Sequence, residues 1–161
     1  MMSNHPTSIH VDVDNACEAD DVPSDELFLY WSTCALEGLR AQAEIAIRIV
    51  DETESAALNT QYRQKTSATN VLSFPSDLPE DCVPPILGDL AICAAVVARE
   101  AHEQQKPLLA HWAHMVIHGV LHLSGFDHID DSEAEIMETR EVAILKTLGF
   151  ADPYQEHHHH A

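Results

Sequence analysis

Three histidines and one glycine late in the chain have the spacing of a metal site. In the stretch HGVLHLSGFDH, His118 and His122 are four residues apart, and Gly125 and His128 follow at intervals of three. Residues four apart lie on one face of a helix, about one turn from each other, so His118 and His122 can offer two imidazoles to one ion. Gly125 lets the chain turn back and His128 can supply a third nitrogen. Three imidazoles leave zinc an open fourth position, as in catalytic sites, although ligand type alone leaves nickel, copper and iron open.

Gly119 occupies the position at which zinc peptidases with this histidine spacing carry a glutamate. That glutamate activates water, and peptide hydrolysis also needs an acid to protonate the amine leaving group. Zinc can lower the pKa of a water molecule without a glutamate, but the proton shuttle is missing from this helix. Gly119 therefore weakens a peptidase assignment and moves the search for a catalytic partner to another part of the chain.

Three polar residues beside the histidine motif allow two interpretations each. Asp127 precedes His128 and could orient that ligand and handle protons, or equally could cap the turn. His111 and His114 lie two turns and one turn before His118, so helical spacing brings them to a similar face. For these two histidines we slightly favour roles around the metal ligands or in a cleft over plain packing.

The elements that must position these residues alternate between strands and helices. The strongest strand signal is the alternation of Ile45, Ile47 and Ile49 with polar neighbours. The pattern predicts a single α+β domain, with a mixed sheet of about four strands packed with helices and the three-histidine site at the end of a central helix. The expected strands are 8–15, 44–51, 70–75 and 87–94; the expected helices run from Ser24 to about Gly38, over 54–63 after a cap at Asp51 or Thr53, through 96–105, from Pro107 to Gly125, and from Asp131 or Ser132 to Gly149.

The composition limits the partners that the chain can bind. Eight basic against 27 acidic residues give a formal net charge of −19, which repels polyanions over most of the surface. A nucleic acid would need a local basic cleft, a metal or a helper protein. No signal peptide or membrane span is visible, so a cytoplasmic protein without a membrane partner is expected. Residues 8–154 are expected to form the domain, with a flexible segment at 1–7 and a disordered His-rich tail at 155–161.

Several stretches together resemble the YbeY family, the bacterial endoribonucleases and ribosomal RNA maturation factors. They are HGVLHLSGFDH (118–128), LNTQYRQKTSATNVLSFP (58–75), LGDLAIC (87–93), HWAHMVIHG (111–119) and the last helix. The resemblance covers roughly residues 8–154, and the ordered series of motifs makes it specific. Phe126 stands where the family commonly has tyrosine, a departure that leaves the metal ligands untouched.

The resemblance implies a function and assigns roles to residues. It implies one Zn²⁺ per chain held by His118, His122 and His128, and a functional arginine at Arg63. It implies a single-strand-specific endoribonuclease acting in ribosomal RNA 3′-end maturation and ribosome quality control, with single-stranded or ribosomal RNA and the ribosome or its proteins as partners. A guanidinium can bind two phosphate oxygens at once, so Arg63 is a plausible catalytic clamp. Either water or the ribose 2′-OH could be the nucleophile.

Two other functions compete with the nuclease. A metalloprotease is favoured by the histidine spacing and opposed by Gly119. A non-catalytic, zinc-stabilised ribosome-assembly factor is favoured by the acidic composition, which suits basic ribosomal proteins better than naked RNA.

Overall fold

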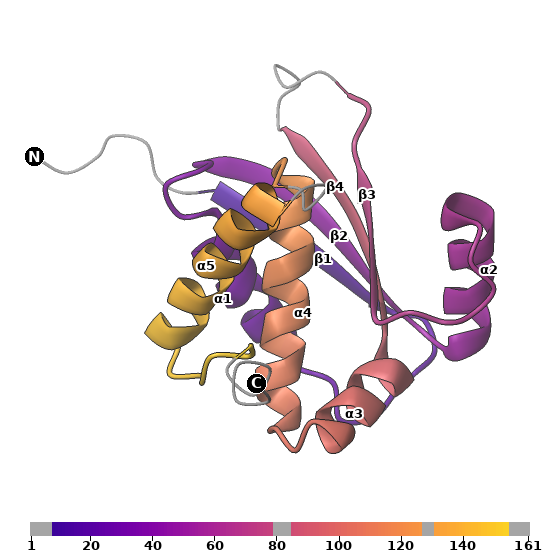
Figure 1. Ribbon diagram of the computed structural model, residues 1–161. Helices are drawn as coiled ribbons and strands as arrows, with labels where there is room; N and C mark the ends of the chain where they lie inside the picture. The colour runs from indigo at the N-terminus through magenta and orange to yellow at the C-terminus, as the bar shows by residue number, and fades with distance from the viewer. Residues whose placement is uncertain (1–7, 79–84, 127–130, 155–161) are drawn as a thin grey trace, which may run out of the picture.

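The structure, a computed structural model, describes residues 8–78, 85–126 and 131–154 (Figure 1). These residues form one domain in which a four-stranded mixed sheet is packed with five helices, so the predicted α+β fold is confirmed. The predicted segments at 1–7 and 155–161 lie outside the described residues. The strands are β1 (Ser8–Asn15), β2 (Gln42–Val50), β3 (Val71–Pro75) and β4 (Ile86–Cys93), and the helices are α1 (Asp25–Leu36), α2 (Glu52–Arg63), α3 (Ala94–Glu103), α4 (Leu108–Leu123) and α5 (Asp131–Thr147).

The sheet has one apolar and one polar face. Its strand order is β1-β2-β4-β3; β2 is parallel to both β1 and β4, and β3 pairs antiparallel with β4 at the edge. Along β2, Ile45, Ile47 and Ile49 are buried whereas Ala46 and Arg48 are exposed. Because successive side chains of a strand point to opposite faces, the isoleucines mark the face that the core must cover.

Helices α1 and α4 lie on the apolar face of the sheet, and α5 packs against these two helices. Figure 1 shows α4 running across the sheet with α1 and α5 beside it. The core between them contains the ring of Phe28, which meets Trp31 and Trp112 edge-on at centroid distances of 6.2 and 5.8 Å. Most of α4 is buried, as expected for a helix that is apolar on nearly all sides. No described helix is long and apolar enough to cross a lipid bilayer.

Helix α2 stands apart from this layer, beyond β3 and β4 (Figure 1). It is capped at its N-terminus by Asp51, whose side chain accepts a hydrogen bond of 2.8 Å from the backbone N–H of Glu54. Its last residue is Arg63, and the next residue, Gln64, takes the left-handed conformation that ends the helix. The cap and this turn fix the two ends of α2, and with them the position of Arg63 on its last turn.

Gly119 lies at a close approach of α4 to β3 and β4. A Cβ atom built on Gly119 would lie 2.8 Å from Cδ2 of Leu90 and 3.3 Å from a methyl group of Val71. Leu90 is fully buried and therefore has little room to move. Gly119 thus allows the close approach of α4 to β3 and β4, and its position points into the core. A glutamate at this position would be buried among apolar side chains.

We predict that substitutions of Gly119 destabilise the fold in proportion to side-chain size. Gly119→Ala should lower the free energy of unfolding by about 1–2 kcal/mol, because the clash with Leu90 exceeds the gain of about 1 kcal/mol in helix propensity. Gly119→Glu should cost more than about 4 kcal/mol, because it also buries a charge. Urea unfolding measures both, and a stable Gly119→Glu protein would contradict the close packing.

Candidate functional site

The two candidate metal ligands on α4 are neighbours at its C-terminal end. The ring centroids of His118 and His122 are 5.1 Å apart, and both side chains are half-buried, whereas the intervening residues are buried. Both histidines line the same cleft. Gly125, just after α4, has a φ of +104°, consistent with the sharp turn expected there. The third candidate ligand, His128, lies outside the described residues.

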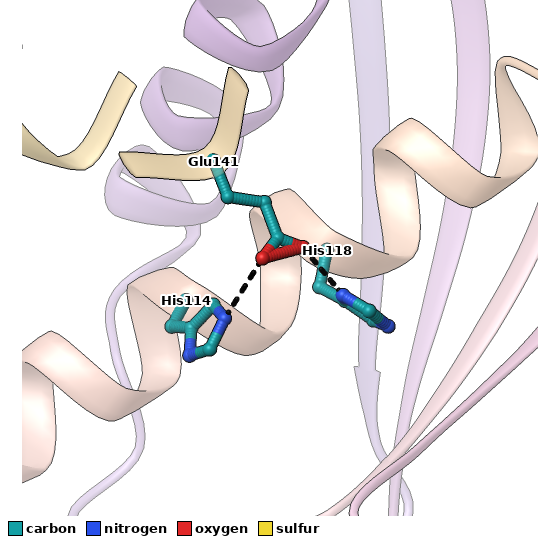
Figure 2. A group of neighbouring side chains, drawn as sticks. All are labelled: His114, His118 and Glu141. Carbon is teal, nitrogen blue, oxygen red and sulfur yellow. Dashed lines mark hydrogen bonds and ion pairs between the residues drawn. The ribbon is translucent and has the colours of Figure 1, made fainter. Parts of the chain in front are cut away.

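A carboxylate from α5 holds the ring of His118. Nδ1 of His118 lies 2.5 Å from Oε2 of Glu141, and Nε2 of His114 lies 3.2 Å from Oε1 of the same carboxylate. Figure 2 shows Glu141 reaching from α5 to the two histidines on α4, with the second ring nitrogen of His118 on the side away from the carboxylate. Glu141 is 0% exposed, so these contacts replace its lost hydration.

Tyr154 completes the surroundings of the carboxylate. Its hydroxyl donates a hydrogen bond to Oε1 of Glu141 and lies 3.1 Å from Nε2 of His114. The rings of Tyr154 and His114 meet edge-on at a centroid distance of 5.3 Å. Through Tyr154, the chain segment after α5 contacts both Glu141 of α5 and His114 of α4.

The charges of this network follow from burial and from its hydrogen bonds. Burial alone would raise the pKa of Glu141, but the hydrogen bonds from His114 and His118 and their charges outweigh it and lower the pKa to about 2. Burial lowers the pKa of His114, which favours a neutral ring. Its Nδ1 is buried without a hydrogen-bond partner among the described residues, which fits a neutral ring with the proton on Nε2, facing Glu141. Burial and the charge of Glu141 raise the pKa of Tyr154, so the phenol keeps the proton that it donates.

His114, His118 and Glu141 lie close enough to form a metal site. One ligand atom from each lies within 4.8 Å of the other two. Two atoms bound to one tetrahedral zinc at its usual bond lengths are about 3.4 Å apart, however, and the 2.5 Å contact between His118 and Glu141 is shorter. In this structure the contact is a hydrogen bond. It fits a carboxylate that orients a histidine whose other nitrogen binds the metal.

Glu141 and Tyr154 were not among the residues that we selected from the sequence. A signal for Glu141 was present, because it shares the buried stripe of α5 with Met137 and Leu145 at four-residue intervals, and an acid in such a stripe needs partners. No comparable pattern marks Tyr154. Of the two histidines whose roles the sequence left open, His114 contacts Glu141, whereas Nε2 of His111 lies 2.8 Å from a carboxylate oxygen of Glu100.

The cleft beside His118 and His122 has a volume of about 1020 Å³ and also contains Arg63. It extends over the polar face of the sheet and past β3 to α2 and α4. Among the described residues, its walls carry two arginines and five acidic side chains. Arg48 donates to Asp14 at 2.8 Å and to Glu54 at 2.6 Å, so its charge is matched. The side chain of Arg63 is exposed and has neither a hydrogen bond nor an ion pair with any other described residue.

We predict that the ionised Glu141 stabilises the fold at neutral pH. The pKa of Glu141 in the folded protein, about 2, lies below its ordinary value of 4.5. The stabilisation is therefore complete above pH 4.5 and is lost as the pH falls towards 2. Over that range the metal-free wild type should lose about 3 kcal/mol more than Glu141→Gln, since one pKa unit corresponds to about 1.4 kcal/mol.

Urea unfolding at pH 7, 4 and 2.5 measures this difference. Glu135→Gln, which removes an exposed acid from the same helix, is the matched control and should follow the wild type. Parallel pH curves for Glu141→Gln and wild type would show that the carboxylate carries no such contribution.

Comparisons with known proteins identify the family and agree with this fold. A family model described as Endoribonuclease YbeY matches residues 14–149. Endoribonuclease YbeY of Methylococcus capsulatus (strain Bath) is 60% identical over 135 residues, which cover 84% of this chain and 89% of that protein. The solution structure of TM1509 from Thermotoga maritima matches with a TM-score of 0.60 over 86% of this chain and 87% of that one; at 24% identity it supports the fold alone. The chain therefore belongs to the endoribonuclease YbeY family.

Proposed function

We propose that this protein is a zinc-dependent endoribonuclease that cuts single-stranded RNA in ribosomal RNA 3′-end maturation and ribosome quality control. The observation that carries the proposal is the cleft shared by His118, His122 and Arg63. It brings two nitrogen ligands and one arginine that is unpaired among the described residues to a single space. Membership of an endoribonuclease family supports the reaction class, and the motifs shared with that family support the ribosomal substrate and the ribosome as a partner.

We assign the metal to His118 and His122, with His128 as the third ligand. The donor set suits the ion, because imidazole nitrogens four residues apart on a helix are a frequent zinc pair. Nε2 of His118 is the atom that we assign to the metal, since Glu141 holds Nδ1 on the opposite side of the ring. When bound, zinc would supply Lewis acidity towards a phosphate oxygen and would lower the pKa of a water molecule.

We assign to Arg63 the stabilisation of charge on the scissile phosphate. Negative charge grows on the nonbridging oxygens as the phosphodiester is cleaved, and a guanidinium can donate to two of them at once. Arg48 has its donors engaged by Asp14 and Glu54, whereas Arg63 has no partner among the described residues. Arg63 can therefore turn its donors to the substrate without breaking an ion pair. The nucleophile, water or the ribose 2′-OH, is identified by whether the products carry 2′,3′-cyclic phosphates.

The two rival functions differ from the nuclease in specific ways. A peptidase lacks the glutamate of its motif here, because position 119 is a glycine packed against the buried Leu90 and does not line the cleft. A non-catalytic assembly factor would lose stability when a zinc ligand is replaced, and no preparation of it would cut RNA.

We predict that His122→Ala lowers both zinc content and RNA cleavage. The protein is prepared without residues 155–161, since the histidines of that tail bind metal themselves. Metal analysis should give about one zinc per chain for wild type and far less for the variant, because two imidazoles hold zinc less tightly than three. His102→Ala removes an exposed histidine of α3 and should match wild type in both assays. A full zinc complement in His122→Ala would remove this residue from the ligand set.

We predict that Arg63→Ala keeps its zinc but lowers kcat by about 100- to 1000-fold, as expected when a donor to developing charge is removed. Arg99→Ala is the matched control, because Arg99 is an exposed arginine that pairs with Glu52 and does not line the cleft. It should cleave RNA like wild type. Cleavage that persists equally in Arg63→Ala and His122→Ala would instead identify a contaminating nuclease.

A further inference from the structure

One aromatic side chain in the cleft has no part in the chemistry described above. Tyr62 precedes Arg63 at the end of α2 and lines the same cleft as His118 and His122. Its side chain is 56% exposed, although it is a large amphipathic ring beside a half-buried apolar neighbour, Phe74. A tyrosine that served only to pack α2 against β3 would be more deeply buried.

Phe74 contacts the ring of Tyr62 in an edge-on arrangement that leaves part of the tyrosine ring uncovered. The two ring centroids are 5.0 Å apart and the planes are inclined by 69°. In such a T-shaped pair Phe74 can cover at most one face of the tyrosine ring, whichever ring supplies the edge. At least one flat face of Tyr62 therefore has no contact with Phe74, next to Arg63.

The position of Tyr62 is fixed by the contacts of α2 with the following loop. Asn59 donates a hydrogen bond of 2.8 Å to the carbonyl oxygen of Ser67, and Ser55 donates one of 3.0 Å to that of Thr69. Both loop residues lie just before β3, which carries Phe74. The tyrosine is thus presented on a rigid support, which reduces the entropy that a bound ligand would cost.

We propose that Tyr62, supported by Phe74, is a stacking subsite for one unpaired nucleobase of the substrate. The inference rests on the proposed function, because it places RNA in the cleft. Bases of single-stranded RNA expose their flat faces, and proteins commonly bind them by stacking on tyrosine or phenylalanine. In a duplex the same faces are covered by neighbouring bases. Tyr62 therefore selects an unpaired nucleotide and places its phosphate beside Arg63.

Stacking would also provide affinity for RNA in a cleft whose acidic side chains outnumber its arginines. Among the described residues the walls carry five acidic side chains against two arginines, one of them neutralised by Asp14 and Glu54, so their excess negative charge repels a polyanion. The attraction between a base and an aromatic ring does not depend on net charge. The subsite therefore adds affinity that salt does not screen, whereas the contact of Arg63 with phosphate is screened.

The decisive experiment combines variants of Tyr62 with abasic substrates. A 12-nucleotide single-stranded RNA and a set of copies, each lacking the base at one position, are cleaved by wild type, Tyr62→Ala, Tyr62→Phe and Tyr62→Leu. We expect one abasic position to raise the KM of wild type by about 5- to 100-fold, the size of one base–aromatic stack, with kcat changed less. Tyr62→Ala should raise KM similarly for the intact RNA and should be insensitive to the missing base, as expected for two partners of one contact.

The other variants separate stacking from packing. Tyr62→Phe should keep the discrimination, whereas Tyr62→Leu, which preserves an apolar contact with Phe74, should lose it. Tyr30→Ala is the matched control, because Tyr30 is also 56% exposed but lies on α1, outside the cleft. The slope of log affinity against log salt should be unchanged in Tyr62→Ala. An unchanged KM in Tyr62→Ala, or equal sensitivity of Tyr62→Ala and wild type to the abasic position, would overturn the proposal.

A binding assay separates this inference from the proposed nuclease activity. The natural tryptophans, Trp31 and Trp112, are buried in the core, so Tyr62→Trp introduces an exposed fluorophore in the cleft. Oligoadenylate should quench its fluorescence and an abasic ribose-phosphate oligomer of equal length should not. Base-dependent quenching without any RNA cleavage by wild type would overturn the proposed nuclease activity and keep the stacking subsite. Cleavage without base-dependent quenching would overturn the stacking subsite and keep the nuclease activity.

Discussion

The buried carboxylate of Glu141 is the constraint on which the rest of the site depends. A charge without access to water is tolerated only where donors replace its hydration, and here His114, His118 and Tyr154 do so. These donors come from α4 and from the segment after α5, so satisfying the carboxylate also sets how the two helices pack. The orientation of His118 is a result of this packing. The site therefore depends on contacts between helices more than on the helix that carries the histidines.

One face of the sheet packs in the hydrophobic core, and the other face lines the cleft. Isoleucines on one face of β2 anchor α1 and α4, while Arg48 and its acidic partners lie on the other, in the cleft. The antiparallel edge strand β3 joins the two sides, because Ser73 contacts the backbone of Gly119 in α4 and Phe74 contacts Tyr62 of α2. Residues more than fifty positions apart along the chain thereby come to one cleft. Of the two arginines that line the cleft among the described residues, Arg48 is held in ion pairs with Asp14 and Glu54, whereas the side chain of Arg63 is not paired.

Local patterns in the sequence were sufficient for the elements and for part of the site. The alternation in β2, the caps at Ser24 and Asp51, and the helical spacing of His118 and His122 are all encoded over a few residues, and the structure has each of them. Arg63 was selected because of a family resemblance, and the structure places it in the same cleft as the two histidines. Whether these residues bind zinc and catalyse cleavage stays a prediction.

The contacts that could not be read from the sequence are those made between distant elements. The sheet order, with β4 between β2 and β3, brings α2 to the cleft, and no periodicity in the chain specifies this order. The bonds of Glu141 to His114 and Tyr154 cross 27 and 13 positions and depend on how α5 packs against α4. An acid in an apolar stripe indicates that partners exist, but it does not identify them.

The bond from Tyr154 to Glu141 couples the end of the described chain to the candidate metal ligands. Tyr154 and His118 share one carboxylate, so the position of each affects the energy of the other. Thermodynamic linkage is reciprocal: an ion that binds better when Tyr154 is docked must, by the same factor, favour docking of Tyr154. For such an ion, resistance of residues 148–154 to proteolysis would report whether the site is occupied, without any substrate.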